Sequence, residues 1–300
     1  MEGVVSAMSH PYDYYDCLEG GKSAPAFDAE AAYEFLSRNS DPVNDIRLSH
    51  WRGDVSDTEF WDVLHKYQAS NGGFMGGLDP DYQGEIGSIH TTIEAMRIMV
   101  AHQQYEGPDV EKVLAFLRST VQPDGTWQEL PDVLASPRCP SWYQPAQFRI
   151  YETSCLAGYA LEFGAYDLWT NAVKYVRQAW MQMPYAETAH PYWAVLLLLG
   201  RSTTSADRSI TLDALENLGT FVRRHKLDAY DCSAVVEILN GINMPEVDDM
   251  LVRVLAMLGA AQDPMDGGIR TEYGDSLRTT ATFNALMAVA LMMQRGLVAS

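Results

Sequence analysis

The chain has 300 residues, of which 47% are hydrophobic, which is enough for a sizeable core in one large domain or two small ones. Its 40 acidic residues outnumber 21 basic ones, and this net charge of -19 argues against nucleic acid or an anionic membrane as the main partner. The four cysteines form no C-x-x-C pair, the first residues do not resemble a secretory signal, and no apolar run approaches the roughly 20 residues of a transmembrane helix, so we expect a cytoplasmic protein.

Helical periodicity runs through most of the chain, and one kind of predicted helix is amphipathic. Apolar side chains recur at i, i+3, i+4 and i+7, which gives one buried and one wet face. Ser56 opens a capping box, S-D-T-E, and Pro108 and Pro245 suit a first helical turn. Three such segments are residues 60–67, 110–117 and 247–258.

The second kind of predicted helix is apolar on nearly every side, which indicates burial all round. These segments are residues 91–101, 153–161, 192–200, 232–239 and 280–293. Amphipathic outer helices that alternate with apolar inner ones predict an all-α fold, an α/α toroid or barrel. We expect a single toroid domain over residues 28–300, after an N-terminal arm of residues 1–27.

Three segments between the two kinds of helix repeat one pattern. Each has a glutamine at the end of an amphipathic helix, then a glycine turn, then an apolar or aromatic residue, and each leads into an apolar helix. Glycine permits such tight reversals. The repeats are "YQASNGGFMGGL" from Tyr67, "VQPDGTWQEL" from Val121 and "AQDPMDGGIRTEY" from Ala261.

A long proline-rich segment, residues 129–149, interrupts the alternation. It is too long for a plain connection between two helices. We predict either a lid or binding element, or a surface excursion that packs across the helices.

The repeats resemble those of the terpenoid cyclases and protein prenyltransferases. "YQASNGGFMGGLDP" is similar to the glutamine and glycine repeat of protein prenyltransferase β subunits, and "VQPDGTW" to the glutamine and tryptophan repeat of squalene-type cyclases. The resemblance covers about residues 55–293. It implies an α/α toroid that acts on an isoprenoid.

The segment "RRHKLDAYDCSAVVEIL" from Arg223 resembles elements of both groups. On the prenyltransferase pattern, Arg223 and Lys226 match two diphosphate-binding cations, although cations also favour a helical C-terminal turn. Ala229 and Asp231 stand where two zinc ligands would be, and threonines stand where the third would be. The resemblance therefore implies no metal ligands from this chain, no zinc, and magnesium only with a bound diphosphate.

On the cyclase pattern D-x-D-D, Asp231 occupies the position of the proton donor, while Ala229 and Cys232 replace its neighbours. Protonation of an alkene requires a carboxylic acid that an apolar pocket keeps neutral. Asp231 is therefore our candidate catalytic acid. The alternative is that Asp231 only caps the helix that follows.

Two further sets of residues are candidates for substrate binding. Aromatic rings at inner-helix positions would face a carbocation, although ordinary core packing also explains them. These are Tyr159, Tyr192, Trp193, Tyr230 and Phe283. Polar residues at the starts of inner helices would orient a head group, although a single histidine is usually structural. These are His90, Glu152, His190 and Arg278.

We therefore expect a terpene cyclase, of isomerase or lyase type, in terpenoid biosynthesis. It would cyclise a prenyl chain or prenyl diphosphate by acid initiation in an apolar barrel cavity, with an isoprenoid as its small-molecule partner. Two alternatives stay open: a zinc-free prenyltransferase that acts on a small-molecule acceptor, and a non-catalytic isoprenoid-binding or β-like subunit. A homo-oligomer or a helical partner subunit fits the acidic amphipathic helices.

Overall fold

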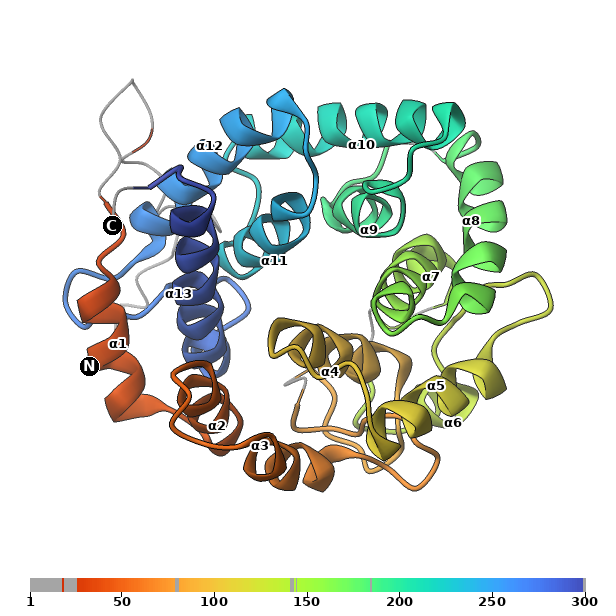
Figure 1. Cartoon of the computed structure of the whole chain (residues 1–300), viewed down its shortest axis with the longest axis horizontal. Coiled ribbons are helices and arrows are strands. Elements are labelled where there is room, and N and C mark those ends of the chain that lie inside the picture. Colours follow the sequence, from red (N-terminus) through yellow and green to blue (C-terminus); the bar gives the residue numbers. More distant parts are fainter. Residues whose placement is uncertain are drawn as a thin grey trace, which may run out of the picture. The chain divides into compact units, whose positions relative to one another are not determined.

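The computed structural model describes residues 18, 26–78, 81–140, 143, 145–183 and 185–298. Over these residues the regular structure is helical, and β pairing is limited to isolated bridges (Figure 1). None of the described helices is both long and apolar enough to cross a bilayer. The predicted arm, residues 1–27, lies almost wholly outside the described residues.

Amphipathic and buried helices alternate along the described chain, as the periodicity predicts. The amphipathic helices are α3 (Asp57–Leu64), α5 (Pro108–Thr120), α8 (Tyr166–Trp180), α10 (Ser205–Arg223) and α12 (Pro245–Ala261). The buried helices are α4 (Ile89–Ala101), α7 (Pro145–Glu162), α9 (His190–Leu199), α11 (Ala229–Asn240) and α13 (Arg278–Gln294). The capping box at Ser56 is confirmed, and Pro108 and Pro245 begin their helices as predicted.

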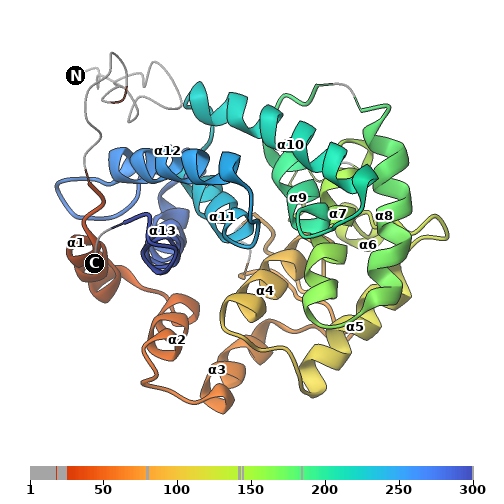
Figure 2. The same cartoon turned by 45° about the horizontal axis from the view of Figure 1, so that its top comes forward.

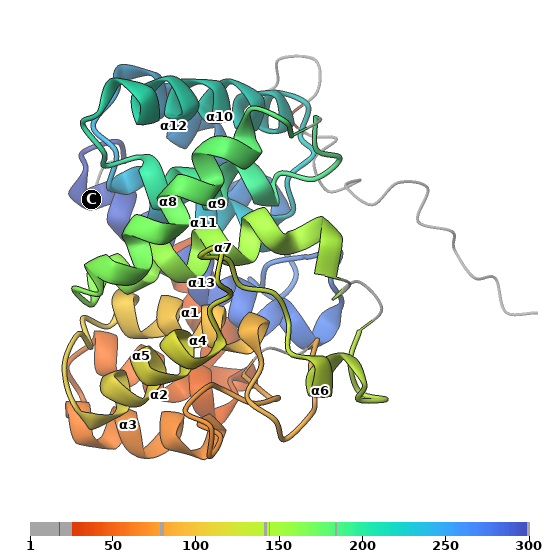
Figure 3. The ribbon, with the colours of Figure 1, turned by 90° about the vertical axis from the view of Figure 1, so that its right-hand side faces the viewer.

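One compact unit comprises Asp41–Leu218, which we call the 41–218 unit. It begins with α2 (Pro42–Trp51), and α7 packs against α4, α8 and α9 (Figure 1). The long proline-rich segment contains α6 (Pro131–Leu134), on the side of the unit where α7 begins (Figure 3). Helix α7 starts at Pro145, so the last residues of the predicted loop are helical.

The other unit, which we call the terminal unit, comprises Met1–Ser40 and Gly219–Ser300. Helix α11 packs against α12 and α13, and α1 (Ala29–Asn39) packs against α13 (Figure 2). The Gln262 amide accepts a hydrogen bond from Asp28 N at 2.7 Å and donates to Asp28 O at 2.8 Å. The glutamine of the last repeat thus ties the chain before α1 to the turn after α12. A single domain over residues 28–300 stays a prediction.

The three repeat turns share a hydrogen-bond pattern that reaches into the next buried helix. In each turn a glycine has a positive φ, and the buried residue two positions later donates its backbone N–H to a threonine hydroxyl. The glycines are Gly72, Gly125 and Gly267, with φ of 90°, 83° and 84°. The bonds run from Phe74 to Thr92 (3.0 Å), from Trp127 to Thr153 (3.1 Å) and from Ile269 to Thr282 (2.8 Å). Because a buried N–H requires a partner, each threonine fixes the register of its helix against the turn.

We predict that Thr153→Val lowers the free energy of unfolding by about 1–3 kcal/mol, because it leaves the buried N–H of Trp127 without an acceptor. Urea unfolding, monitored by circular dichroism, measures the loss of unfolding free energy. The control is Thr170→Val on the exposed face of α8, where the hydroxyl bonds only to Tyr166 O of its own helix. Equal stability of the two variants would contradict the role given to Thr153.

A buried carboxylate ties α10 to α8. Asp207 accepts hydrogen bonds from Arg177 Nε at 2.6 Å, Arg177 Nη2 at 2.8 Å and Thr204 Oγ1 at 2.7 Å, and a further one from Ser202 Oγ. Burial alone would raise the pKa of Asp207, but these donors and the charge of Arg177 outweigh it and lower the pKa to about 2. The interaction therefore stabilises the folded state only while Asp207 is ionised.

We predict that Asp207→Asn costs roughly 2 kcal/mol of stability at pH 7, from a pKa held about 2 units below that of the unfolded chain. Because the folded-state pKa is the lower one, this stability is present above about pH 4. It disappears as the pH falls through about 2, the pKa of Asp207 in the folded protein. The difference in unfolding free energy between wild type and variant, measured by urea titration, should therefore become smaller as the pH falls from about 4 to about 2. Asp167→Asn, at a largely exposed ion pair with Arg118, should change stability far less.

Candidate active site

A cluster of carboxyl, imidazole and aromatic groups lies where buried helices of the 41–218 unit meet the long proline-rich segment. Helices α4 and α9 contribute residues from their first turns, and α7 contributes residues from its second turn. The members are His90 on α4, Tyr151 and Glu152 on α7, His190 and Trp193 on α9, and Glu129 and Tyr143 on the long segment. We call these residues the His90 cluster.

Glu129 caps the start of α4. Its Oε1 accepts hydrogen bonds from Ile89 N at 3.0 Å and from Leu130 N at 2.8 Å. Its Oε2 accepts from His90 N at 3.2 Å and lies 3.4 Å from His90 Nδ1. Burial opposes ionisation, but His90 and the backbone N–H groups together lower the pKa of Glu129. Because anions are also favoured at a helix N-terminus, Glu129 is held in its charged form.

Glu152 is in the opposite electrostatic situation. Its side chain is 1% exposed, its Oε1 lies 3.4 Å from His90 Nδ1, and its Oε2 has no hydrogen-bond partner among the described residues. Burial raises the pKa of Glu152 to about 7; His90 opposes that shift and the charge of Glu129 adds to it. Glu152 therefore holds a proton in a much larger fraction of molecules at neutral pH than an ordinary glutamate.

Aromatic rings pack against His90 and against one another in this cluster. Tyr143 stacks on His90 with ring centroids 4.0 Å apart and planes 16° apart. Tyr151 meets Trp193 edge-on at 5.2 Å and His190 edge-on at 5.6 Å. The Trp193 Nε1–H is buried and has no acceptor among the described residues. Such π faces attract cations, so the cluster combines a carboxyl group of raised pKa with rings that can stabilise positive charge.

The long segment forms a wall of this cluster. Tyr143 packs with Tyr82 and Val133 in a buried apolar group, to which Leu130, Leu134 and Cys139 add. Arg138 Nη1 also donates to Gln83 O at 3.0 Å, which fastens the segment to the turn before α4. Since Glu129 and Tyr143 both come from it, the segment supplies side chains to the candidate site.

Asp231, the predicted catalytic acid, lies in the first turn of α11 in the terminal unit. It is 6% exposed, and its Oδ2 accepts a hydrogen bond from Tyr273 OH at 2.9 Å. The N-cap is Asp228, which accepts from Tyr230 N and from Thr271 Oγ1, each at 2.8 Å. The interpretation of Asp231 as the cap was therefore wrong by three residues, because the helix begins one turn earlier. Its role as an acid stays a prediction.

The predicted diphosphate-binding cations do not lie in a buried site. Arg223 and Lys226 are exposed, at and just after the C-terminal end of α10, and Arg223 Nη2 donates to Thr220 Oγ1 at 3.1 Å. Arg278 donates to Asp266 Oδ1 at 2.8 Å and lies over the ring of Phe35. A role for these cations in substrate binding stays a prediction.

The remaining predicted aromatic residues are distributed over several helices. The ring of Tyr192 meets Trp180 of α8 edge-on, and its hydroxyl accepts a hydrogen bond from Ala186 N, so it packs between helices. Tyr230 meets Tyr273 edge-on at 6.1 Å. Tyr159 and Phe283 are buried in α7 and α13. Of the predicted set, His90, Glu152, His190 and Trp193 are brought together.

Several residues of these sites were not singled out from the sequence. Glu129 was noted only as the first residue of the long segment, and Tyr143, Tyr151 and Tyr273 were given no role. The available signal for Glu129 is its place two residues after Trp127, the fully buried residue of the second repeat. A carboxyl group so close to the core needs donors, and the start of a neighbouring helix supplies them.

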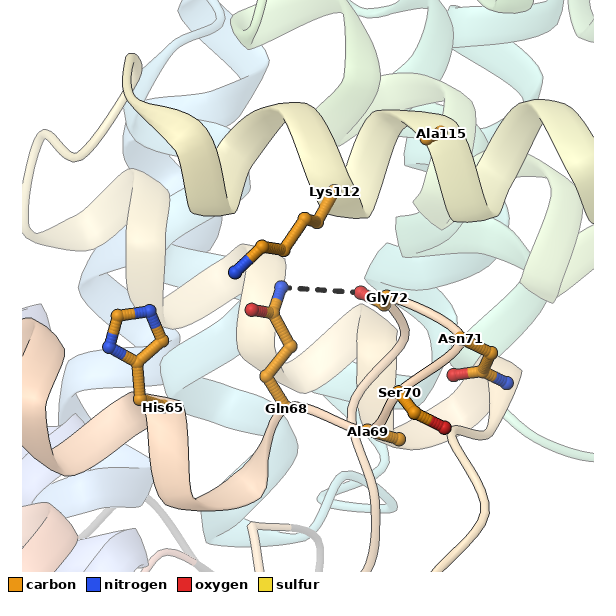
Figure 4. Close-up of a pocket in the computed structure, with 8 residues that line it drawn as sticks. All are labelled: His65, Gln68, Ala69, Ser70, Asn71, Gly72, Lys112 and Ala115. Atoms are coloured by element: carbon orange, nitrogen blue, oxygen red, sulfur yellow. Dashed lines mark hydrogen bonds between the residues drawn. The ribbon is translucent and has the colours of Figure 1, made fainter.

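A separate pocket of about 510 Å³ lies between the first repeat turn and α5 (Figure 4). Its lining includes His65, Gln68 and Lys112, and Gln68 Nε2 donates to Gly72 O at 3.3 Å across it. His65 and Lys112 both pair with Asp109, at 2.6 Å and 2.9 Å. No member of the His90 cluster lines this pocket, which is formed by the first repeat turn and by residues next to it.

Comparisons with known proteins give matches among solved structures. No protein-family model matches this chain, and no similar sequence was found among curated proteins. The type II terpene cyclase MstE from Scytonema matches with a TM-score of 0.59 and 12% identity, over 90% of this chain and 98% of the cyclase. A protein from Actinoplanes matches with a TM-score of 0.56 and 12% identity, over 88% of this chain and 98% of that protein.

A variant of the same Scytonema cyclase, in complex with its substrate geranylgeranyl dihydroxybenzoate, matches with a TM-score of 0.52 and 13% identity. That match covers 92% of this chain and 90% of the other. At these identities the likeness concerns the fold. Thus the chain has the all-α fold predicted from its sequence, the α/α toroid of alternating inner and outer helices that is found in terpenoid cyclases.

Proposed function

We propose that this protein catalyses the acid-initiated cyclisation of a prenyl chain and that Glu152 is the general acid. The observation that carries the proposal is a pair of neighbouring buried carboxyl groups with opposite pKa shifts, inside an aromatic cluster. Environments that push two pKa values apart are typical of acid and base pairs in enzymes. The toroid fold shared with a type II terpene cyclase supports the same reaction class.

In the proposed step, the proton of Glu152 adds to one carbon of an alkene, and the π electron pair forms the new C–H bond. The other carbon becomes a tertiary carbocation, which the next double bond of the prenyl chain attacks to close a ring. The rings of Tyr151 and Trp193 stabilise the charge. The last cation loses a proton to water, whose oxygen supplies the electron pair for the new O–H bond, while the electron pair of the broken C–H bond forms a double bond. These steps need no metal ion.

Asp231 is the second candidate for the acid, from its place in the D-x-D-D pattern. Its side chain accepts a hydrogen bond from Tyr273, whereas Glu152 has an oxygen without a partner among the described residues. That oxygen is available to carry and deliver a proton, so we favour Glu152. The exposed positions of Arg223 and Lys226 likewise favour cyclisation over prenyl transfer from a diphosphate. A cytoplasmic location remains an expectation from the cysteine pattern.

We predict that Glu152→Gln lowers the rate of cyclisation by about 10²-fold or more, the usual contribution of a general acid, while Asp231→Asn retains most of it. Geranylgeraniol, geranylgeranyl diphosphate and geranylgeranyl dihydroxybenzoate are the test substrates, and mass spectrometry with gas chromatography identifies cyclic isomers. The chelator EDTA should leave the rate unchanged.

The matched control is Glu162→Gln, which removes a carboxyl group from the same helix, at an ion pair with Arg201 near the surface. Circular dichroism checks that each variant is folded. Loss of activity in Asp231→Asn with full activity in Glu152→Gln would move the acid to α11 and refute our assignment.

We also predict that kcat/KM falls as the pH rises through about 7, the value to which burial raises the pKa of Glu152. Only the protonated form donates, so the rate should drop about tenfold per pH unit once the group is ionised. A pH profile from 5.5 to 9 with the uncharged substrate geranylgeraniol measures this. A rate that stays constant up to pH 9 would exclude an acid with this pKa.

A further inference from the structure

The proposed reaction leaves Glu152 in need of a proton after each turnover. Once Glu152 has protonated the substrate, two buried carboxylates lie beside the same imidazole, with side chains that are 0% exposed for Glu129 and 1% for Glu152. Two like charges at one buried site are unfavourable, which favours the return of a proton to Glu152. Neither side chain, however, has more than marginal contact with water.

His90 contacts both the buried carboxyl groups and solvent. Its side chain is 11% exposed, and its Nδ1 lies 3.4 Å from Glu129 Oε2 and 3.4 Å from Glu152 Oε1. The stacked ring of Tyr143, at 4.0 Å, fixes the plane of the imidazole. Of these three ionisable groups, only the imidazole therefore touches both the buried acid and water.

We infer that His90 is the relay that returns a proton from solvent to Glu152 after each turnover. This inference rests on the proposed function, in which Glu152 is the acid. His90 acts through Glu152 and does not itself protonate the substrate. Imidazole suits the task, because it is the side chain that gains and loses a proton near neutral pH.

The relay conserves protons and electrons. A hydronium ion protonates the neutral imidazole, and the imidazolium then donates its Nδ1–H to Glu152 Oε1. The N–H bond breaks with its electron pair left on nitrogen, and an O–H bond forms. Exchange of ring protons with water restores the Nδ1–H form. One proton has then moved from solvent to Glu152, which replaces the proton that the substrate received.

The carboxyl groups beside the imidazole favour a proton on Nδ1. Glu129, which the start of α4 holds in its ionised form, attracts the proton on Nδ1. Glu152 accepts this proton only when Glu152 itself is deprotonated. The rings of Tyr143 and Tyr151 pack against the imidazole and bring no charge near neutral pH. Arg149 acts on Glu152 from the second turn of α7. Because Glu129 already has backbone donors, the deprotonated Glu152 is the carboxylate that takes the proton of Nδ1.

The test is His90→Asn, assayed in single-turnover and in steady-state kinetics with geranylgeraniol. The asparagine amide keeps an N–H donor near the position of Nδ1 but cannot gain and lose a proton. At about pH 6, below the pKa of about 7, Glu152 starts protonated in most molecules. We therefore expect the single-turnover rate at this pH to stay within about threefold of wild type, and the steady-state rate to fall about tenfold or more. Added free imidazole should restore the steady-state rate.

His65→Asn, a histidine outside the cluster, is the matched control and should leave both rates unchanged. Equal losses in the two regimes would indicate a purely structural role and would overturn the relay, as would no loss in either. If His90→Asn does not fold, His90→Gln is assayed in the same way. If Glu152 is not the acid, the result is different: Glu152→Gln then keeps the single-turnover rate of the wild type.

Discussion

Two carboxyl groups packed against one imidazole cannot both be charged without a large electrostatic cost, and the candidate site is built around that constraint. Glu129 takes the charge, because the N–H groups at the start of α4 and the imidazole of His90 stabilise its anion. Glu152 keeps its proton up to a higher pH than an ordinary glutamate, because burial and the neighbouring anion both disfavour its ionised form. The acidity of one residue is thus set by the hydrogen bonds of another.

The repeat turns fix the positions of the helices that carry His90 and Glu152. Thr153 bonds to Trp127 N and directly follows Glu152, while Thr92 bonds to Phe74 N and lies two residues after His90. Each bond fixes the register of a buried helix against its own turn. Helices α4 and α7 also pack together, so the carboxyl group of one and the imidazole of the other meet at 3.4 Å.

The fold was largely predictable, because its signal is local. Apolar residues at helical spacing, the capping box at Ser56 and the glycine turns report on neighbours in sequence, and these features were found as expected. The site was predictable only in part. His90 and Glu152 were selected as polar residues on otherwise apolar helices, but as groups that bind a substrate and not as an acid and its partner.

What could not be predicted depends on contacts distant in sequence. A pKa depends on burial and on the charge of a residue elsewhere in the chain, here Glu129, which the sequence shows only as one acidic residue among 40. Tyr143 lies in a segment without periodicity, so nothing local places its ring on His90. The D-x-D-D resemblance drew attention to Asp231, whereas the helix start one turn earlier made Asp228 the cap.

The position of Glu129 on a connecting segment has a consequence for how such a scaffold diversifies. The helices and their threonine bonds hold Glu152, the proposed proton donor, in place. Its acidity depends on Glu129, a residue that insertion, deletion or exchange of the segment can replace. Transplanting this segment between related toroids would retune the donor without repacking the framework.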